Sequence, residues 1–491
     1  MSSSVRPGFS APKKASGARR WLQPRLSREQ LYRLAPRKER PERLGKVDAW
    51  DRVRGALRHW ALWLTAAFIA SLTGNRLAAF GLAAAAAILN LARPKFHPAV
   101  YPIESTLVPG SPEFRVTMGG MTGTAYLPGN RVRIYNNGDE FYPAMLEAIE
   151  AAQQSVTMEQ YIFWDSSVGL RFAEAFATKA RSGVPVKLLV DAVGSATIGE
   201  NTLRILEAGG CQLAWFHPIR WYTLSSANNR THRKSIVVDG RVAFTGGAGL
   251  ADHWLGNAET PREWRDLMVG VEGPAALVQQ AGFAQNWMQT TGEILAGNVF
   301  FPTPVSCGDV AVQTISSSSA GDFSSAGTMY LVALQSSQRY IHITNPYFVP
   351  SSAVIELLAR AVRRGAQVRL VLAGSHSDTW WARQNSIRLY GKLLKAGVEI
   401  HEYLPTMLHH KTMVVDGTWA TVGTANFDNR SFALNEETNL CFGDASIIGD
   451  LERIFADDLS HSRRVTLEEW RRRSPWQRLV EQAASLIEDQ V

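Results

Sequence analysis

Cysteine is scarce in this sequence of 491 residues. The three cysteines, Cys211, Cys307 and Cys441, are widely spaced and form no Cys-x-x-Cys pair. The sequence therefore predicts neither a disulfide framework nor a thiolate zinc site. We expect free thiols in a reducing compartment, and a protein that uses no metal and no other cofactor.

A long hydrophobic run is also missing, since a spanning helix needs roughly 20 apolar residues. Residues 60–73 and 77–92 are almost wholly apolar, and Gly74-Asn75-Arg76 separates them. For residues 60–93 we consider a helical hairpin that dips into a bilayer, a single span that tolerates Arg76, and a buried soluble helix pair. The flanking tryptophans and the positive charge just before the run favour a membrane segment with a cytoplasmic N-terminus.

The net positive charge belongs to the N-terminal tail. The net charge is +8, yet residues 1–59 carry 16 Lys/Arg and 5 Asp/Glu, or +11, which leaves −3 for the rest. A net-negative body is a poor electrostatic match for nucleic acid, so we expect no nucleic-acid partner. The tail is predicted to be disordered or loosely helical and to bind an anionic membrane surface, with a mitochondrial presequence as the alternative.

Strand and helix patterns alternate from about residue 130. The spacing of apolar residues predicts, in order, strand 132–135, helix 141–153, strand 156–163, helix 170–182 and strand 186–190. Alternation of this kind predicts an α/β fold with a mainly parallel or mixed sheet flanked by helices.

The same order returns after a Ser-rich stretch, residues 316–325, which by composition is a flexible linker. The second set comprises strand 341–348, helix 353–364 and strand 368–372. We therefore predict an internal duplication, with domains at 130–300 and 310–465 in a pseudo-two-fold arrangement.

One motif occurs once in each predicted domain. His409 and Lys411 are followed by Asp416, Gly423 and Asn426. Residues two apart on a strand share a face, so this histidine and lysine should point into one cleft. The earlier copy has His232, Lys234, Asp239 and Gly246 at the same spacing, but Gly249 where the later copy has asparagine.

Phosphoryl transfer without a metal requires a nucleophile, a proton donor for the leaving alcohol, and fixed positive charge near the nonbridging oxygens. Histidine can fill the first two roles near neutral pH. Lys234 and Lys411 would supply the charge, and Asn426 a further hydrogen bond. Asp239 and Asp416 belong to the catalytic motifs, but they follow apolar strands at turns, so we expect them to be structural.

The paired motif resembles that of the phospholipase D superfamily. The phrases 228–234, 347–350, 403–409 and 466–473 are similar to the bacterial cardiolipin synthase branch, and the likeness covers roughly residues 130–480. The resemblance implies that His232 attacks phosphorus and that His409 acts as acid and base. It also implies that Asp266 and Glu437, 34 and 28 residues after their histidines, hold the imidazoles. Gly246, Gly247 and Thr424 are expected to bind substrate.

Two further segments have open interpretations. Residues 219–228 insert Arg220, Trp221 and Tyr222 before the first motif, either as a headgroup or interface contact or as a plain surface loop. Residues 466–491 join a basic cluster to a helix with an apolar stripe, which would lie on a membrane or pack on the catalytic body.

The resemblance implies a membrane-associated phosphatidyltransferase of the bacterial inner membrane. It would transfer a phosphatidyl group from one phosphatidylglycerol to another through a phosphohistidine, releasing glycerol. Hydrolysis of a phosphodiester is the first alternative. A membrane-binding protein with impaired catalysis is the second, and Gly249 is its only support. The sequence does not predict the oligomeric state.

Overall fold

The computed structural model describes residues 60–91, 107–219, 228–318 and 324–485. The strands of the first half are β1 (Leu127–Asn136), β2 (Val156–Gln160), β3 (Val186–Asp191), β4 (Gln212–Phe216), β5 (Lys234–Val238), β6 (Val242–Gly246) and β7 (Leu267–Glu272). Its helices are α6 (Gly138–Ala151), α7 (Ser167–Arg181), α8 (Glu200–Gly209), the short 3-10 helix η1 (Asp252–Trp254) and α9 (Pro274–Thr291).

The second half repeats this order. Its strands are β8 (Val310–Ser317), β9 (Tyr340–Asn345), β10 (Gln367–Ala373), β11 (Glu399–Tyr403), β12 (Lys411–Val415), β13 (Trp419–Gly423), β14 (Glu437–Phe442) and β15 (Ser462–Val465). Its helices are α10 (Ser325–Ser336), α11 (Ser352–Arg363), α12 (Trp380–Lys395), α13 (Asn429–Ala433) and α14 (Ala445–Ser460). The predicted strands and helices of both halves are confirmed within a few residues.

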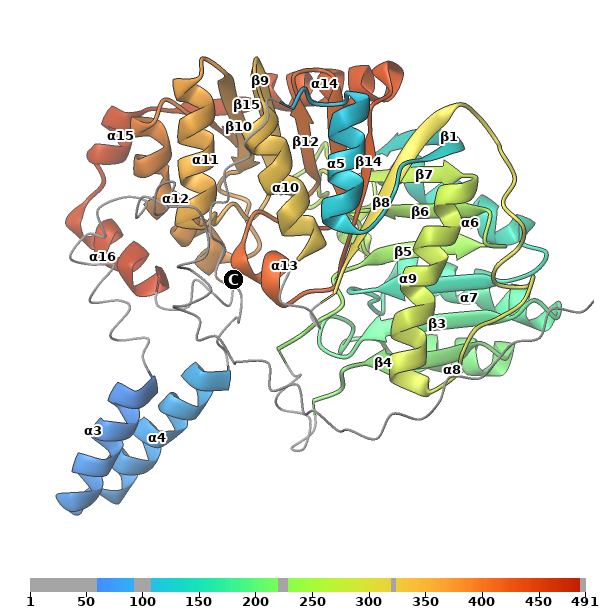
Figure 1. Cartoon of the computed structure of the whole chain (residues 1–491). Coiled ribbons are helices and arrows are strands. Elements are labelled where there is room, and N and C mark those ends of the chain that lie inside the picture. The colour runs from blue at the N-terminus through green and yellow to red at the C-terminus, as the bar shows by residue number, and fades with distance from the viewer. Residues whose placement is uncertain (1–59, 92–106, 220–227, 319–323, 486–491) are drawn as a thin grey trace, which may run out of the picture. The chain divides into compact units, whose positions relative to one another are not determined.

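All these strands belong to one sheet, in the order β15-β11-β10-β9-β12-β13-β14-β8-β1-β7-β6-β5-β2-β3-β4. Apart from β15, the order consists of two equivalent sets of seven strands, which meet where β8 pairs with β1. Figure 1 shows the two sets as the green and the orange to red parts of the ribbon. The duplicated order means that corresponding strands of the two halves lie at equal distances from the seam.

Of the two expected forms, mainly parallel or mixed, the sheet is mixed. Only β2-β3-β4 and β9-β10-β11 pair in parallel, because helices connect them in crossovers. The remaining strands pair antiparallel. The antiparallel pairs include the motif hairpins β5-β6 and β12-β13, in which β6 and β13 lie one strand closer to the seam than β5 and β12.

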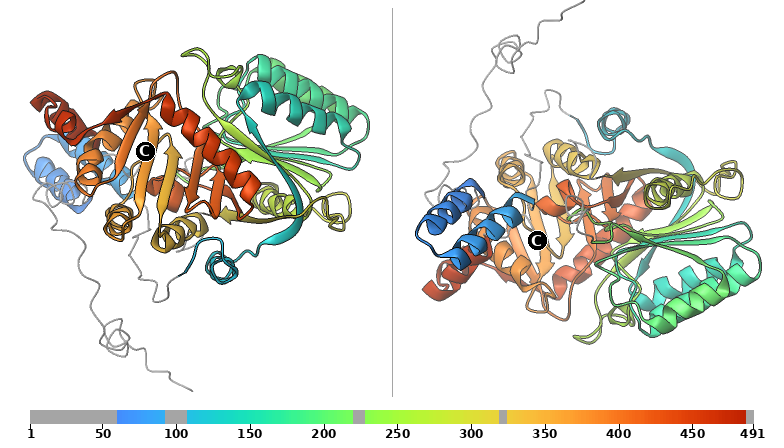
Figure 2. Two further views of the ribbon diagram at one scale, coloured as in Figure 1. Left: turned by 90° about the horizontal axis from the view of Figure 1, so that it is seen from above. Right: turned by 90° about the horizontal axis from the view of Figure 1, so that it is seen from below.

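Helices cover both faces of each half (Figures 1 and 2). In the first half, Leu188 and Val190 of β3 pack with α6 and α7, while Leu189 between them packs with Phe283 and Trp287 of α9. This is the alternation expected of a strand that is buried on both sides. In the second half, α14 packs on one face, and α10, α11 and α12 on the other.

Two segments differ from the sequence-based expectation. The supposed flexible linker is structured at its ends, since Ser316 and Ser317 pair with β14 and Ser324 caps α10, while residues 319–323 lie outside the described part. The helix α5 (Pro112–Thr122) was not predicted. Its buried Phe114 packs edge-on against Trp419 of β13 at a centroid distance of 5.9 Å.

Residues 60–91 form two helices, α3 (Trp60–Leu72) and α4 (Arg76–Leu91), which pack along each other. Gly74 lies between them with φ of +79°, a left-handed conformation that ends α3 and excludes one continuous span through Arg76. Phe68, Leu77 and Phe80 are largely exposed. Among the described helices, none has the length and apolar content needed to cross a membrane.

The described C-terminal residues pack on the catalytic body. Helices α15 (Leu467–Arg471) and α16 (Pro475–Ala484) contact α12, where the Gln477 amide donates to Gln384 and the Asn385 amide donates to the carbonyl of Ala484. Of the two alternatives for the C-terminal segment, this geometry corresponds to the one in which the helix packs on the rest of the protein and not on a membrane. Trp476 and Leu479 nevertheless remain exposed.

Candidate active site

The backbone brings each motif histidine to the other half of the molecule. The amide of His232 donates to the carbonyl of Glu436 at 2.9 Å, and that of His409 donates to the carbonyl of Arg265 at 2.8 Å. Both contacts are parallel bridges between the residues just before a motif strand and the residues just before β14 or β7. Each histidine therefore lies beside the acid of the opposite half.

The two buried acids are exchanged relative to the sequence-based pairing. Nδ1 of His232 lies 3.1 and 3.0 Å from the two carboxylate oxygens of Glu437, and Nδ1 of His409 lies 2.8 Å from Oδ2 of Asp266. Pairing within each half was wrong because the seam is antiparallel and places each acid across it. A carboxylate can only accept, so each Nδ1 carries the hydrogen and each Nε2 keeps its lone pair.

Different groups support the two carboxylates. Glu437 accepts from the Thr424 hydroxyl and, at 3.4 Å, from the Asn435 amide. Asp266 accepts from the indole of Trp254 at 2.8 Å and from its own neighbouring amide, Leu267, at 2.8 Å. Thr424 therefore supports the carboxylate of Glu437 and is not among the residues that line the pocket.

Gly246 and Gly247 also stand behind the site. A Cβ at Gly247 would meet Oδ1 of Asp266 at 2.1 Å, and one at Gly246 would meet the carbonyl of Leu267 at 2.2 Å. The carboxylate of Asp266 occupies the space that a side chain at 247 would need. The two glycines therefore leave the space that Asp266 occupies, and they do not contact substrate.

The two lysines are fully enclosed. Nζ of Lys234 donates to the carbonyl of His232 at 2.9 Å and lies over the ring of Tyr161 at 5.5 Å. Nζ of Lys411 lies closer to its imidazole, 3.2 Å from Nδ1 and 3.1 Å from Nε2 of His409. Each lysine therefore brings its amino group close to the histidine of its own motif.

Burial and crowding of like charge shift the pKa of every member of this cluster. Burial, reinforced by the lysines, lowers the pKa of His232 to about 4 and that of His409 to about 3. Burial also lowers the pKa of Lys234 to about 7 and that of Lys411 to about 8. At neutral pH both imidazoles are therefore neutral before substrate binds.

The acids are shifted in the opposite sense. Burial alone would raise the pKa of Glu437, but His232 and Lys234 outweigh it and hold that pKa at about 2. For Asp266, His409 and Lys411 likewise overcome burial and lower the pKa. Both carboxylates are therefore ionised across the physiological range and can accept the Nδ1 hydrogens.

The motif aspartates lie away from the histidines. Asp239 accepts from the backbone amides of Gln153, Gln154 and Ser155, and Asp416 accepts from those of Gln338, Arg339 and Tyr340. Both have positive φ, 54° and 56°, and each is followed by a glycine with positive φ, as in a tight primed hairpin turn. They anchor β5 and β12 to the starts of β2 and β9.

The halves differ at the last motif position. Asn426 is 5 % exposed, lines the pocket and leaves its Oδ1 without a partner among the described residues. A Cβ at Gly249 would come within 2.9 Å of Cβ of Ile162 and of the Trp254 ring. The space of the missing amide is filled by the tryptophan that donates to Asp266.

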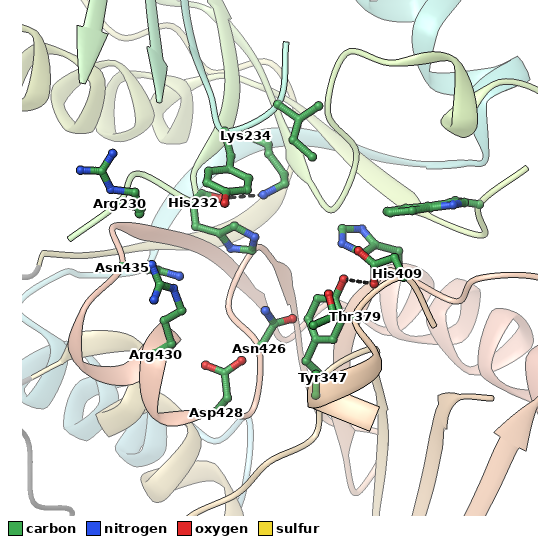
Figure 3. Close-up of a pocket in the computed structure, with 15 residues that line it drawn as sticks. Arg230, His232, Lys234, Tyr347, Thr379, His409, Asn426, Asp428, Arg430 and Asn435 are labelled. Carbon is green, nitrogen blue, oxygen red and sulfur yellow. Dashed lines mark hydrogen bonds between the residues drawn. The ribbon is translucent and has the colours of Figure 1, made fainter. Parts of the chain in front are cut away.

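A pocket opens over the two histidines (Figure 3). Its lining residues come from both halves: Tyr161, Ile162, Arg230, His232, Lys234, Trp264, Tyr347, Asp378, Thr379, Ala382, His409, Asn426, Asp428, Arg430 and Asn435. Figure 3 shows Asn435, Arg430 and Asp428 beyond His232, and Tyr347 and Thr379 beside His409. The predicted contacts Arg220, Trp221 and Tyr222 lie outside the described residues.

Several lining residues were not predicted as site residues. Asp428 and Arg430 follow Asn426 so closely in sequence that proximity alone was a usable signal. Tyr347 begins the phrase 347–350 that resembles the cardiolipin synthase branch, and that resemblance was a usable signal. Asp378 carries no such signal, because the crossover loop before α12 brings it to the pocket. No group of three His, Cys, Asp or Glu side chains suited to a metal ion occurs in the described part of the chain.

Comparison with known proteins gives consistent matches. Residues 145–276 and 330–459 match the family model described as cardiolipin synthase, PLD-like domain. Cardiolipin synthase 1 of Bacillus anthracis is 32% identical over 364 residues, covering 72% of this chain and 71% of that protein. Cardiolipin synthase A of Pseudomonas putida (strain GB-1) is 34% identical over 362 residues, covering 74% and 75%.

Among solved structures, phosphatidylserine synthase of Haemophilus influenzae Rd KW20 superposes with a TM-score of 0.59. The alignment covers 77% of this chain and 100% of that one, at 12% sequence identity. Identity this low supports the shared fold alone.

Proposed function

The chain belongs to the cardiolipin synthase family with phospholipase D-like domains, and from this membership we propose that it makes cardiolipin from two phosphatidylglycerol molecules, with glycerol as the second product. It is a phosphatidyltransferase of the phospholipase D superfamily. The observation that carries the proposal is the crossed pairing, since the acids engage Nδ1 of both imidazoles, and both histidines line one pocket together with Lys234, with Lys411 3.1 Å from Nε2 of His409. The matched order of strands supports a pseudo-two-fold axis at the seam.

In the first step, Nε2 of His232 attacks the phosphorus of the donor. A phosphorus–nitrogen bond forms as the bond from phosphorus to the headgroup glycerol oxygen breaks. His409 gives its Nε2 proton to that oxygen, and glycerol leaves. Lys234, Lys411 and the Asn426 amide stabilise the charge on the nonbridging oxygens.

In the second step, Nε2 of His409 removes a proton from a headgroup hydroxyl of the second phosphatidylglycerol. The resulting oxygen attacks phosphorus, the bond to His232 breaks, and cardiolipin is released. His232 returns to its neutral form, with Glu437 holding its Nδ1 hydrogen throughout.

Substrate binding explains how His409 acquires the proton that it donates. In the free protein, Lys411 lies 3.1 Å from Nε2 of His409 and opposes its protonation. The phosphodiester brings a negative charge that pairs with this lysine and cancels part of the repulsion. The pKa of His409 therefore rises when the donor binds, and only the loaded site is an efficient acid.

The lipid substrates imply association with a membrane, which for this family we take to be the bacterial cell membrane. The exposed apolar side chains of α3 and α4 would enter one leaflet as a hairpin, and the basic tail, residues 1–59, would lie on its anionic cytoplasmic surface. Protease accessibility of the tail in sealed inside-out vesicles, whose outer face is the cytoplasmic one, tests this orientation. Cleavage of the tail only after the vesicles are opened would contradict it.

Mass spectrometry of the products formed from phosphatidylglycerol vesicles tests the function. The purified full-length protein should yield cardiolipin and free glycerol, and the His409→Ala variant should yield about 10²- to 10⁴-fold less of both. Phosphatidic acid in place of cardiolipin would make the protein a hydrolase. No turnover by the wild type would favour a catalytically impaired member of the family.

A further inference from the structure

One carboxylate in the pocket has no place in the steps above. Asp378 precedes α12, lines the pocket and is solvent-exposed. A carboxylate opposes the binding of an anionic phosphodiester, so its presence beside the phosphate site requires another explanation. The pocket's other unassigned carboxylate, Asp428, already accepts from the amide of Ser431 and caps α13, which accounts for its position.

The contacts of Asp378 leave it free to accept more hydrogen bonds. Its Oδ1 accepts from the Tyr347 hydroxyl at 2.5 Å, and no ion pair to it is found in the described ranges. A carboxylate has about four acceptor sites, so a single donor leaves most of them open. Thr379 adds a hydroxyl at the same edge, which does not cap α12 and instead shares a hydrogen bond with the Tyr347 hydroxyl.

This cluster lies on the side of the pocket where the alcohol must be. An in-line displacement places the nucleophile and the leaving oxygen on opposite sides of phosphorus, so glycerol departs toward His409. The ring of Tyr347 packs edge-on against the His409 imidazole at a centroid distance of 6.1 Å. Figure 3 shows Tyr347 and Thr379 next to His409, across the pocket from Arg230 and Asn435.

The chemistry of the headgroup matches the cluster. A phosphodiester offers only acceptors, and the lysines and the asparagine amide meet them, whereas the free glycerol hydroxyls are donors. We propose that Tyr347, Asp378 and Thr379 form a polyol subsite, which holds the glycerol of the donor as it leaves and the glycerol of the second lipid as it attacks. This inference rests on the proposed function and deepens it, since it assigns the preference for a lipid polyol over water or a simple alcohol to Asp378.

A chromogenic donor separates the test of the proposed function from the test of the polyol subsite. Phosphatidyl p-nitrophenol has a leaving group without hydroxyls, so its release in the first turnover reports formation of the phosphohistidine alone. With glycerol and 1-propanol supplied together at equal concentration, the ratio of phosphatidylglycerol to phosphatidylpropanol reports the choice of acceptor. The full-length chain in detergent micelles is assayed, with Asp457→Ala as the control, because Asp457 is exposed on α14 and does not line the pocket.

The wild type and the control should favour glycerol. In Asp378→Ala the ratio should fall about tenfold or more, the effect of losing a hydrogen bond to a charged acceptor, while p-nitrophenol release changes less than about threefold. Asp378→Asn keeps one acceptor oxygen and should be intermediate. Tyr347→Phe keeps the carboxylate and should retain most of the preference.

Two results would overturn different claims. An acceptor ratio in Asp378→Ala and Asp378→Asn equal to that of the wild type would remove the polyol subsite and leave the proposed function standing. Absence of p-nitrophenol release from the wild type would remove the two-histidine chemistry itself. If Asp378→Ala does not fold, the Asn variant alone decides.

Discussion

The two histidines stand in unlike surroundings although their motifs are nearly identical. His232 is bordered by Tyr161 and faces a polar wall that includes Asn426 and Asn435. His409 is enclosed by Trp254, Trp264 and Tyr347, with ring centroids 5.6, 5.1 and 6.1 Å away. Duplication supplied two equal imidazoles, and their neighbours make them unequal: one is placed among hydrogen-bonding groups, the other in an aromatic enclosure beside an ammonium.

The largest expected effect separates nucleophile from acid. His232→Ala should reduce cardiolipin formation by roughly 10⁶-fold, as removal of a covalent nucleophile does elsewhere, and His409→Ala by about 10²- to 10⁴-fold. A p-nitrophenyl donor needs no protonation, so rapid-quench measurements should detect a burst with His409→Ala and none with His232→Ala. A burst from His232→Ala alone would reverse the two roles.

Breaking the crossed pairs should cost up to about 10⁴-fold, because each imidazole then loses the group that fixes its tautomer. Glu437→Gln should slow formation of the phosphohistidine even with the p-nitrophenyl donor, whereas Asp266→Asn should spare that step and slow transfer from phosphatidylglycerol. Stopped-flow and product assays on the two variants provide the measurement. If Asp266→Asn instead slowed formation of the phosphohistidine and Glu437→Gln spared it, each acid would serve the histidine of its own half in solution.

The last motif residue, Asn426 in one half and Gly249 in the other, provides a further test of the difference between the halves. Asn426→Gly should lower the rate by about 10²-fold through loss of one donor to the phosphoryl oxygens. Gly249→Asn should not raise it, because the new side chain collides with Ile162 and Trp254, and overpacking costs about 1–3 kcal/mol. Activity assays and thermal unfolding of both variants test this. Higher activity of Gly249→Asn at unchanged stability would contradict the account.

The smallest expected effect is on stability against pH. Burial and Lys411 lower the pKa of His409 from 6.5 to about 3. As the pH falls below 6.5, the unfolded chain binds a proton here and the folded chain does not, so the free energy of unfolding falls. His409→Asn should remove up to about 1.4 kcal/mol per pH unit of that slope. Denaturant titrations of the wild type and of His409→Asn between about pH 4.5 and 6.5 would measure the free energy of unfolding at each pH. Equal slopes of that free energy against pH in the two proteins would refute the prediction.

Much of this architecture follows from local sequence pattern. The period of apolar residues predicts the βαβ units, and the repeated spacing after His232 and His409 predicts the two motif strands and their turns. Which acid serves which histidine could not be predicted, because it depends on the antiparallel seam between β1 and β8. Asp378 was missed for a related reason: only the crossover into α12 brings it to the pocket.

The crossed pairing also has a consequence for the order in which the chain is made. His232 and Glu437 are 205 residues apart, and His409 and Asp266 are 143 apart. A growing chain folds from its N-terminus, so the first half emerges from the ribosome with its nucleophile but without that nucleophile's carboxylate. His232 is not oriented until Glu437, the first residue of β14, has been synthesised, and His409 itself is made 143 residues after the acid that serves it. A partly made chain beside the membrane therefore lacks the means to cut the lipids around it.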